Sequence, residues 1–381
     1  MTKIFLNLDL FRFINEYTDL RSLCDTSVLF ATSKKYINYK LNEKYSLMYY
    51  DDSLFRNRVL TRIFNPNKQL HLKLSQCDNI TNVSVLRNVH TLFLSHCKNI
   101  KDVSPLGNVH TLCLNGCNIK DVSALGNINS LYLDSCDIED VSALGNVNTL
   151  CLTRCVNIKD VSALGKVRTL FLGGCYKIKD VSALGKVHNL FLTECKNIKD
   201  VSALGHVYRL ILYGCNIEDV SALCDVHTLD LGNCKNIKDV SALGNVYDLD
   251  LRYCTNIKDV SKLGKVHALN LSGCNIKDLS ALYNVYKLDL SYSDIKDVSA
   301  FGNVRILDLS NCRNITDVSA LGNVHTLILR YCQNIEDVSK LGKVNTLDLT
   351  GCEKITDVSA LGNVSKLNLS GCYNIKFKCI R

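Results

Sequence analysis

The stretch NIKDVSALGNINSLYLDSC, residues 118–136, decides the fold because the chain repeats it with small changes. The letters DVSAL occur nine times in the 381 residues, and KDVSALG occurs five times unchanged. Self-similarity at a period of about twenty residues is typical of proteins that stack one structural unit on the next. The sequence therefore predicts one long array instead of several unrelated domains.

A cysteine marks each copy of the repeat through the motif L-x-L-x-x-C. Copies are 19 or 20 residues long, because some have one more residue between the cysteine and the next Asn. Ser293 takes the cysteine's place once, which gives sixteen units. The cysteines of the motif are Cys77, Cys97, Cys117, Cys136, Cys155, Cys175, Cys195, Cys215, Cys234, Cys254, Cys274, Cys312, Cys332, Cys352 and Cys372.

One unit predicts a short strand followed by a tight helical turn. The letters V-x-x-L-x-L alternate as in a strand. The Asp before V-S-A-L can cap the turn by accepting a free backbone N–H. We expect the following Gly to end the turn in a left-handed conformation, which glycine adopts easily. No single unit can bury its apolar side, so stacked units are expected to share one core.

The pattern L-x-x-L-x-L-x-x-C-x-N-I resembles the leucine-rich repeat, and I-x-D-V-S-A-L resembles its short, internalin-like variety. The resemblance covers residues 68–375. It implies an α/β solenoid, an arc with a parallel β-sheet on the concave face and short helical or 3-10 turns on the convex face. We expect residues 67–381 to form sixteen rungs with a short tail, and residues 1–66 to form a small all-α N-terminal domain.

Composition narrows the class of protein. The net charge of +8 is spread thinly, and no basic block predicts binding to nucleic acid. No apolar run is long enough to cross a bilayer, and the N-terminus lacks the features of a secretory signal. We therefore expect a soluble, cytoplasmic chain.

Cysteine and histidine recur often enough to raise the question of a metal site. A row of rungs supplies one ligand per turn, whereas tetrahedral zinc needs four ligands that converge. Disulfides would need an oxidising compartment. We expect buried thiols bonded to backbone, and no metal or cofactor. The recurring histidines, also expected to be structural, are His90, His110, His188, His227, His267 and His325.

The middle residue of L-x-L varies and should point away from the core. Successive rungs carry apolar or aromatic residues first and acidic or amide residues later, which predicts an apolar stripe followed by an acidic one. We interpret this face as a binding surface for a protein with an apolar and a basic segment. Strand propensity or recent duplication is the alternative explanation. The predicted binding residues are Phe93, Tyr132, Phe171, Phe191, Ile211, Tyr213, Asp230, Asp250, Arg252, Asp289, Asp308 and Arg330.

Residues 1–66 lack the repeat and have apolar residues at helical spacing, and Asn65-Pro66-Asn67 is the predicted boundary. The stretch LDLFRFINEYTDLRSLCDTSVLFATSKKY resembles an F-box, although the family's Pro and Trp are missing. The alternative is a helical cap that shields the edge of the first rung. The F-box-like residues are Leu8, Leu10, Ile14, Tyr17, Asp19 and Leu20.

The whole chain is similar to F-box and leucine-rich repeat proteins of giant DNA viruses. That resemblance implies docking of residues 1–66 on Skp1 of a host cullin ubiquitin ligase, with the repeats selecting a protein for ubiquitination in the host cytoplasm. A scaffold or decoy without a ligase link is the alternative. No nucleophile–base pair or phosphate loop appears, so we expect no enzyme. The target and the oligomeric state stay open.

Overall fold

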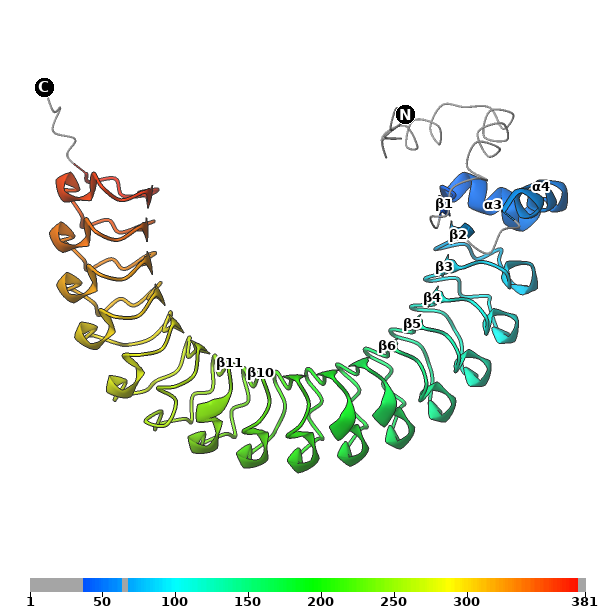
Figure 1. The fold of residues 1–381 in the computed structure, drawn as a ribbon, viewed down its shortest axis with the longest axis horizontal. Helices are drawn as coiled ribbons and strands as arrows, with labels where there is room; N and C mark the ends of the chain where they lie inside the picture. The colour runs from blue at the N-terminus through cyan, green and yellow to red at the C-terminus, as the bar shows by residue number, and fades with distance from the viewer. Residues whose placement is uncertain (1–36, 64–67, 376–381) are drawn as a thin grey trace, which may run out of the picture. The chain divides into compact units, whose positions relative to one another are not determined.

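Each repeat forms one short strand and one tight turn in the computed structural model, which describes residues 37–63 and 68–375. The strands line one side of the stacked rungs and the 3-10 turns line the opposite side (Figure 1). The chain forms two compact units, Met1–Val156 and Asn157–Arg381.

The first unit contains two helices and six strands in its described part. Parallel pairing runs in chain order from the first of these strands to the last. The helices are α3 (Glu43–Asp51) and α4 (Ser53–Ile63). The strands are β1 (Ile37–Lys40), β2 (Lys68–Lys73), β3 (Thr91–Phe93), β4 (Thr111–Cys113), β5 (Ser130–Tyr132) and β6 (Thr149–Cys151).

The described N-terminal region is helical, as predicted, but it also contains a strand. β1 pairs in parallel with β2, so a strand covers the edge of the first rung. Asn42 accepts the N–H of Tyr45 and caps α3, and Asp52 accepts the N–H of Leu54 and starts α4. Neither helix is long and apolar enough to cross a membrane. The six F-box-like residues lie outside the described residues.

The described part of the second unit, residues 157–375, consists of rungs. Each of its strands pairs in parallel with the next, and leucine faces leucine across every pair, as in Leu170 and Leu190. The strands are β7 (Thr169–Phe171), β8 (Asn189–Phe191), β9 (Arg209–Ile211), β10 (Thr228–Asp230), β11 (Asp248–Asp250), β12 (Ala268–Asn270), β13 (Lys287–Asp289), β14 (Ile306–Asp308), β15 (Thr326–Ile328), β16 (Thr346–Asp348) and β17 (Lys366–Asn368).

Repeated Leu, Ile, Val and Cys side chains fill the core of each unit. All eighteen cysteines in the described residues are free thiols. The Cys195 thiol donates to the Leu172 carbonyl oxygen of the preceding rung at 3.2 Å, and Cys234 does the same to Leu212 at 3.1 Å. Burial raises the pKa of Cys234 to about 12. The prediction of buried thiols bonded to backbone is confirmed.

The predicted aspartate cap is also confirmed. Asp180 Oδ1 accepts the backbone N–H of Ser182 at 2.9 Å at the start of the turn Ser182–Lys186. Equivalent aspartates make this bond in fourteen rungs of the described residues. Each bond satisfies a donor that the short turn leaves free.

The prediction of a left-handed glycine after the turn was wrong. Gly205 has a φ of −59°, in the ordinary right-handed region. Glycine suits this place because a Cβ on Gly205 would overlap the Ala222 carbonyl oxygen of the next rung, although Cys224 and Tyr283 occupy the same place in other rungs. The left-handed residue of each of the sixteen rungs is instead the one before the cysteine position, such as Glu194 or Tyr253.

Candidate functional site

The candidate site is the strand face of the second unit, which we define as the residues between and directly after the two leucines of each strand. The flanking leucines are buried, as at Leu190 and Leu192 with no exposed area. The alternation of a strand therefore turns Phe191 toward solvent, where it is partly exposed.

An aromatic cluster occupies strands β7 to β9 of this face. The rings of Phe171 and Phe191 stack at 4.3 Å between centroids, with 12° between their planes. The Arg209 guanidinium lies 5.8 Å from the centroid of Phe191. Ile211 follows on the adjacent strand. Tyr213 follows Leu212, the second leucine of the same rung. A cation over an aromatic ring is attracted by the ring's negative face, so arginine borders this cluster favourably.

Arg252 links the aromatic cluster to the acidic part of the face. Its guanidinium lies 5.2 Å from the centroid of the Tyr213 ring. It also forms ion pairs of 3.3 Å with Asp230 and 3.2 Å with Asp250. Burial raises the pKa of Asp250 to about 6, against the opposing effects of the Arg252 backbone N–H and guanidinium.

The acidic stripe carries less free charge than the sequence suggested. Arg330 pairs with Asp348 at 2.7 Å, just as Arg252 neutralises two carboxylates. Asp289 and Asp308 have no ion pair within the described residues. Each still accepts a backbone N–H at 2.9 Å from the serine two residues later. The aspartates therefore also serve to end their strands.

In the first unit, the corresponding middle residues are partly exposed at some rungs and buried at others. Phe93 is 39% exposed and Tyr132 is partly exposed. Cys113 and Cys151, however, are buried, so the exposed part of the predicted apolar stripe is interrupted at these rungs. Their small thiols lie against neighbouring hydroxyls, with Cys113 Sγ 3.1 Å from Ser95 Oγ.

The structure brings most predicted binding residues together in two groups of the second unit. Phe93 and Tyr132 belong to the other unit and join neither group. The first group lies on β7 to β11 or two residues after them and comprises Phe171, Phe191, Ile211, Tyr213, Asp230, Asp250 and Arg252. The second group lies on β13 to β15 or two residues after them and comprises Asp289, Asp308 and Arg330.

Sequence reasoning missed a row of exposed rings next to this face. Tyr208, Tyr247 and Tyr286 alternate with histidines at the residue just before successive strands, and the rings stack. Aligning the repeats in register shows these tyrosines in one column. From the sequence, only the histidines of this column were interpreted, and the tyrosines at the same place in alternate rungs were not.

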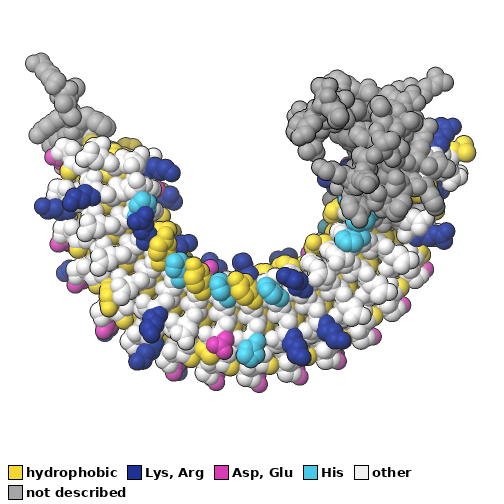
Figure 2. Space-filling view, in the orientation of Figure 1, with side chains coloured by type: hydrophobic (Ala, Val, Ile, Leu, Met, Phe, Trp, Pro, Cys, Tyr) yellow, Lys and Arg dark blue, Asp and Glu magenta, His cyan; other side chains and the backbone are white. Residues whose placement is uncertain are grey.

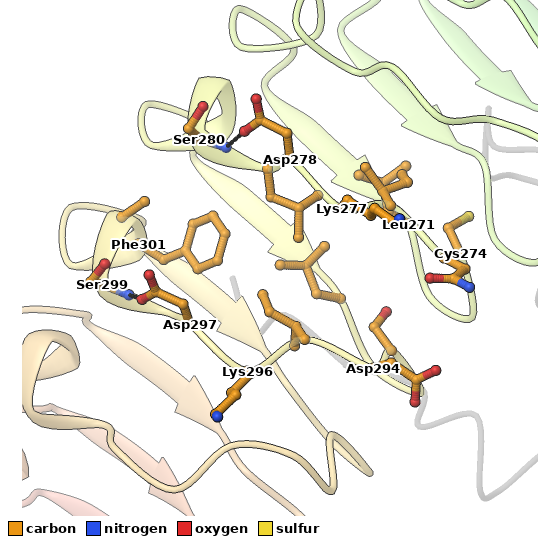
Figure 3. Close-up of a pocket in the computed structure, with 17 residues that line it drawn as sticks. Leu271, Cys274, Lys277, Asp278, Ser280, Asp294, Lys296, Asp297, Ser299 and Phe301 are labelled. Atoms are coloured by element: carbon orange, nitrogen blue, oxygen red, sulfur yellow. Dashed lines mark hydrogen bonds between the residues drawn. The ribbon is translucent and has the colours of Figure 1, made fainter.

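An open pocket of about 430 Å³ lies where the cysteine ladder is interrupted (Figure 3). Ser293 replaces the cysteine and donates to a carbonyl oxygen within its own rung. Leu279 and Phe301 are larger than the Val and Leu of other copies, and the neighbouring Ile276 and Ile295 are only partly buried. Charged side chains of both signs line the pocket, so charge does not select a ligand. These are Lys277, Asp278, Asp294, Lys296 and Asp297.

Comparisons with known proteins identify the fold. No protein-family model matches the sequence, and no curated relative does. An internalin, inlF of Listeria monocytogenes, has a similar structure at 24% identity, with 77% of this chain and 89% of that chain covered and a TM-score of 0.53. The chain folds as a leucine-rich repeat solenoid.

Two further leucine-rich repeat structures are similar at lower scores. A leucine-rich repeat protein of Leptospira interrogans is 18% identical, with 79% of this chain and 90% of that chain covered and a TM-score of 0.49. The functional domain of InlJ from Listeria monocytogenes, which includes a cysteine ladder, is 20% identical, with 81% and 71% covered and a TM-score of 0.47.

The described rungs present extended surfaces of side chains. Within the described residues, no group of three or more His, Cys, Asp or Glu side chains could hold a metal ion. The buried thiols are held in their protonated form, since burial raises the pKa of Cys195 to about 11 and of Cys352 to about 12.

Proposed function

We propose that this chain is a non-enzymatic protein-binding module that holds a partner segment on the strand face of its second unit. The observation that supports this most is the stacked pair of Phe171 and Phe191, which is partly exposed on adjacent strands. Aromatic side chains beside arginine are typical of the residues that dominate binding energy at protein interfaces. An apolar side chain of the partner would cover this pair and Ile211.

The carboxylates of the strand face indicate which side chains the other end of the partner segment should carry. Asp289 and Asp308 are the carboxylates of this face's second group that form no ion pair within the described residues. Five strand spacings separate β8 from β13, or about 24 Å, which an extended chain of about seven residues spans. We therefore propose a partner segment with apolar side chains at one end and Lys or Arg at the other.

The finer proposal is that residues 1–66 connect this module to Skp1 of a cullin ubiquitin ligase, so that the bound protein is a substrate. This role requires a cytoplasmic location. If the same residues only cap the solenoid, the chain is a scaffold or decoy with the same binding face. The adaptor role rests on the resemblance of Leu8, Leu10, Ile14, Tyr17, Asp19 and Leu20 to an F-box.

The strand-face proposal is tested with peptides selected on the full chain from a library of random hexadecapeptides. We expect Phe171→Ser with Phe191→Ser to weaken the selected peptides about tenfold or more, since truncating a central aromatic anchor removes over 1 kcal/mol. Tyr176→Ser, which changes a 48% exposed ring away from the strand face, is the matched control. Equal losses in the control, or no loss in the double variant, would show that binding lies elsewhere.

The charge and the adaptor role have separate tests. Asp289→Asn with Asp308→Asn should weaken only those selected peptides that carry Lys or Arg, and should reduce the salt dependence of their binding. Purified Skp1 should bind the full chain and lose binding to Leu10→Ser with Leu20→Ser, while the Phe171 and Phe191 variant keeps it. Failure of Skp1 to bind the folded full chain leaves the scaffold as the function.

A further inference from the structure

Six aromatic rings form a continuous row along the strand entrances of the second unit. Each ring belongs to the residue directly before a strand, from β8 to β13. Neighbouring centroids lie 4.4 to 4.9 Å apart, with 12° to 30° between ring planes. The aromatic row is His188, Tyr208, His227, Tyr247, His267 and Tyr286.

Backbone hydrogen bonds hold the row in register. The N–H of His227 donates to the carbonyl oxygen of Tyr208 at 3.1 Å, and the N–H of Tyr247 donates to that of His227 at 3.2 Å. The rung spacing is close to the stacking distance of two rings, so stacked rungs impose stacked rings. The alternation of His and Tyr occurs only at these rungs; Asn occupies the same place at Asn148 and Asn345.

The row is open to solvent along its length. Tyr208 and Tyr247 are each 47% exposed and Tyr286 is 46% exposed. Figure 2 looks onto this side and shows histidines alternating with hydrophobic-class side chains, with lysines and arginines along them. A contiguous exposed aromatic stripe is uncommon on a surface that nothing covers.

The edges of the rings, not their faces, are available to a partner. Each ring face inside the row is covered by the next ring. The edges carry hydrogen-bond donors, the phenol O–H and the imidazole N–H. The Thr228 hydroxyl lies 3.3 Å from Nδ1 of His227 and can donate to it, which leaves the Nε2–H of His227 for a partner. At His188, Nδ1 donates to the Asn189 amide oxygen at 3.1 Å, so Nε2 of the neutral ring accepts a hydrogen bond and does not donate one.

Positive charge borders the row. Four basic side chains are sequence neighbours of the rings or lie on the next rung at either end of the row, and Asp248 is the acidic neighbour. Four positive charges against one negative leave an excess of +3 beside a line of hydrogen-bond donors. The basic side chains are Arg168, Arg209, Lys287 and Arg305.

We propose that the aromatic row and its basic border form a second docking surface, which binds an extended, acidic segment of a protein partner. Carboxylates fit both features, since they accept hydrogen bonds from the ring edges and pair with the bordering cations. Single-stranded nucleic acid fits less well, because bases bind by stacking on ring faces, and those faces are occupied. Five rung spacings, about 24 Å, match about seven extended residues.

The test measures binding of a fluorescein-labelled glutamate dodecamer to the full chain by fluorescence anisotropy, beside a glutamine dodecamer and a uridine dodecamer RNA. We expect the glutamate peptide to bind at least about tenfold more tightly than either of the others, because only it carries carboxylates. Equal binding of the glutamine peptide, or tighter binding of the RNA, overturns the proposal.

The variants replace residues by those that other rungs of this chain already carry, so the fold is preserved. Tyr208→Asn with Tyr247→Asn and Tyr286→Asn should weaken the glutamate peptide about tenfold. A second variant, Lys287→Thr with Arg305→Asn, should weaken it several-fold and reduce its salt dependence, because both bordering cations are lost.

The charge control removes two cations from the side of the turns. Lys179→Thr with Lys199→Thr copies the residue at Thr316 and should change the affinity less than about twofold, since exposed charges more than a Debye length away are screened. A loss as large in this control as in the variant of Lys287 and Arg305 would mean that only net charge binds the peptide, and would overturn the proposal. Neither test alters Phe171 or Phe191, so the result is independent of the strand-face proposal.

Discussion

Aspartates lie on two sides of the second unit, and the two sets differ in their surroundings. On the turn side, Asp180 is fully exposed, and the backbone N–H of Ser182 holds its pKa below the usual value. On the strand face, burial raises the pKa of Asp230 and Asp308 above the usual value, and that of Asp250 to about 6. The same residue type therefore stabilises the turn side when charged and opposes folding on the strand face when charged.

The comparison shows why one side repeats and the other varies. The letters of DVSALG make contacts that recur in most rungs, although Cys224 and Tyr283 take the place of the glycine. The Asp closes the turn, and the glycine lies against an alanine carbonyl oxygen of the following rung. The strand-face letters contact solvent and their immediate neighbours, so they can differ from rung to rung. The repeated residues hold the rungs together, and the variable residues form the surface that is available for binding.

The largest expected effect comes from adding one methyl group on the turn side. In Gly185→Ala the new Cβ would overlap the Ala203 carbonyl oxygen, whereas in Gly362→Ala the new Cβ meets nothing within 4 Å among the described residues. We expect Gly185→Ala to lower the free energy of unfolding by about 2 to 3 kcal/mol and Gly362→Ala to change it by less than about 0.5 kcal/mol. Urea unfolding followed by circular dichroism measures both, and equal effects would contradict the rung-to-rung contact.

The next largest effect is expected on the strand face, where removing the charge of Asp250 should stabilise the protein and removing that of Asp348 should destabilise it. Since the pKa of Asp250 is raised, the folded state holds its proton more tightly between pH 4 and 6, and the stability that this gives is lost as pH rises through 6. Asp250→Asn should therefore stabilise the protein at pH 7.5 by about 1 to 2 kcal/mol, allowing for partial solvent screening. Its amide oxygen can keep the bond to the backbone, as Asn270 does to Ser272 at 2.9 Å.

Asp348→Asn is the matched control on the same face. Burial alone would raise the pKa of Asp348, but hydrogen bonds from Thr350 and Arg330 lower it. Its stabilising effect is present at neutral pH and is lost as pH falls through the folded pKa. We expect Asp348→Asn to destabilise the protein at pH 7.5 and Asp250→Asn to stabilise it. Thermal unfolding at pH 4.5 and 7.5 measures both, and changes of the same sign would refute the assignment.

The sequence predicted those features of the fold that depend on the residues of one rung. Strand alternation, the buried thiol and the aspartate cap follow from local spacing and from the need to satisfy backbone groups. The prediction of a left-handed Gly205 was wrong because the space at this residue is limited by the carbonyl oxygen of the next rung. The sequence of a single unit does not give the position of that oxygen. Strand β1 was missed because its partner, β2, lies across two helices in the sequence.

The candidate site was predictable in composition but not in its electrostatics. The column of middle residues correctly identified Phe171 and Phe191 as neighbours on one face. The ion pairs of Arg252 with Asp230 and Asp250 depend on side-chain reach across two rungs, which letter spacing does not give. Binding by any of these residues stays a prediction.

A smaller effect is expected where the ladder is interrupted. Within the described residues, no side chain donates to the Leu271 carbonyl oxygen, whereas the equivalent Leu290 oxygen accepts the thiol of Cys312 at 3.2 Å. Ser293→Cys would restore the donor and bury a less polar atom, so we expect a gain of about 1 kcal/mol in the free energy of unfolding. Cys254→Ser, in a regular rung, should lose about as much. A loss of stability in Ser293→Cys would mean that the pocket itself requires the hydroxyl.

The smallest effect at neutral pH is expected from neutralising a turn aspartate. Asp180→Asn keeps an acceptor for the Ser182 N–H, as Asn82 does for Ser84 at 2.9 Å, and removes only the charge. Asp180→Ala removes the acceptor as well and should lower the unfolding midpoint more. Because the pKa of Asp180 is lowered in the folded state, its contribution is present above the unfolded pKa and is lost as pH falls through the folded pKa. Between pH 5 and 2, the midpoint of thermal unfolding should therefore fall less steeply in the Asn variant than in the unmodified chain. An equally steep fall would mean that the charge of Asp180 does not contribute to the stability of the turn.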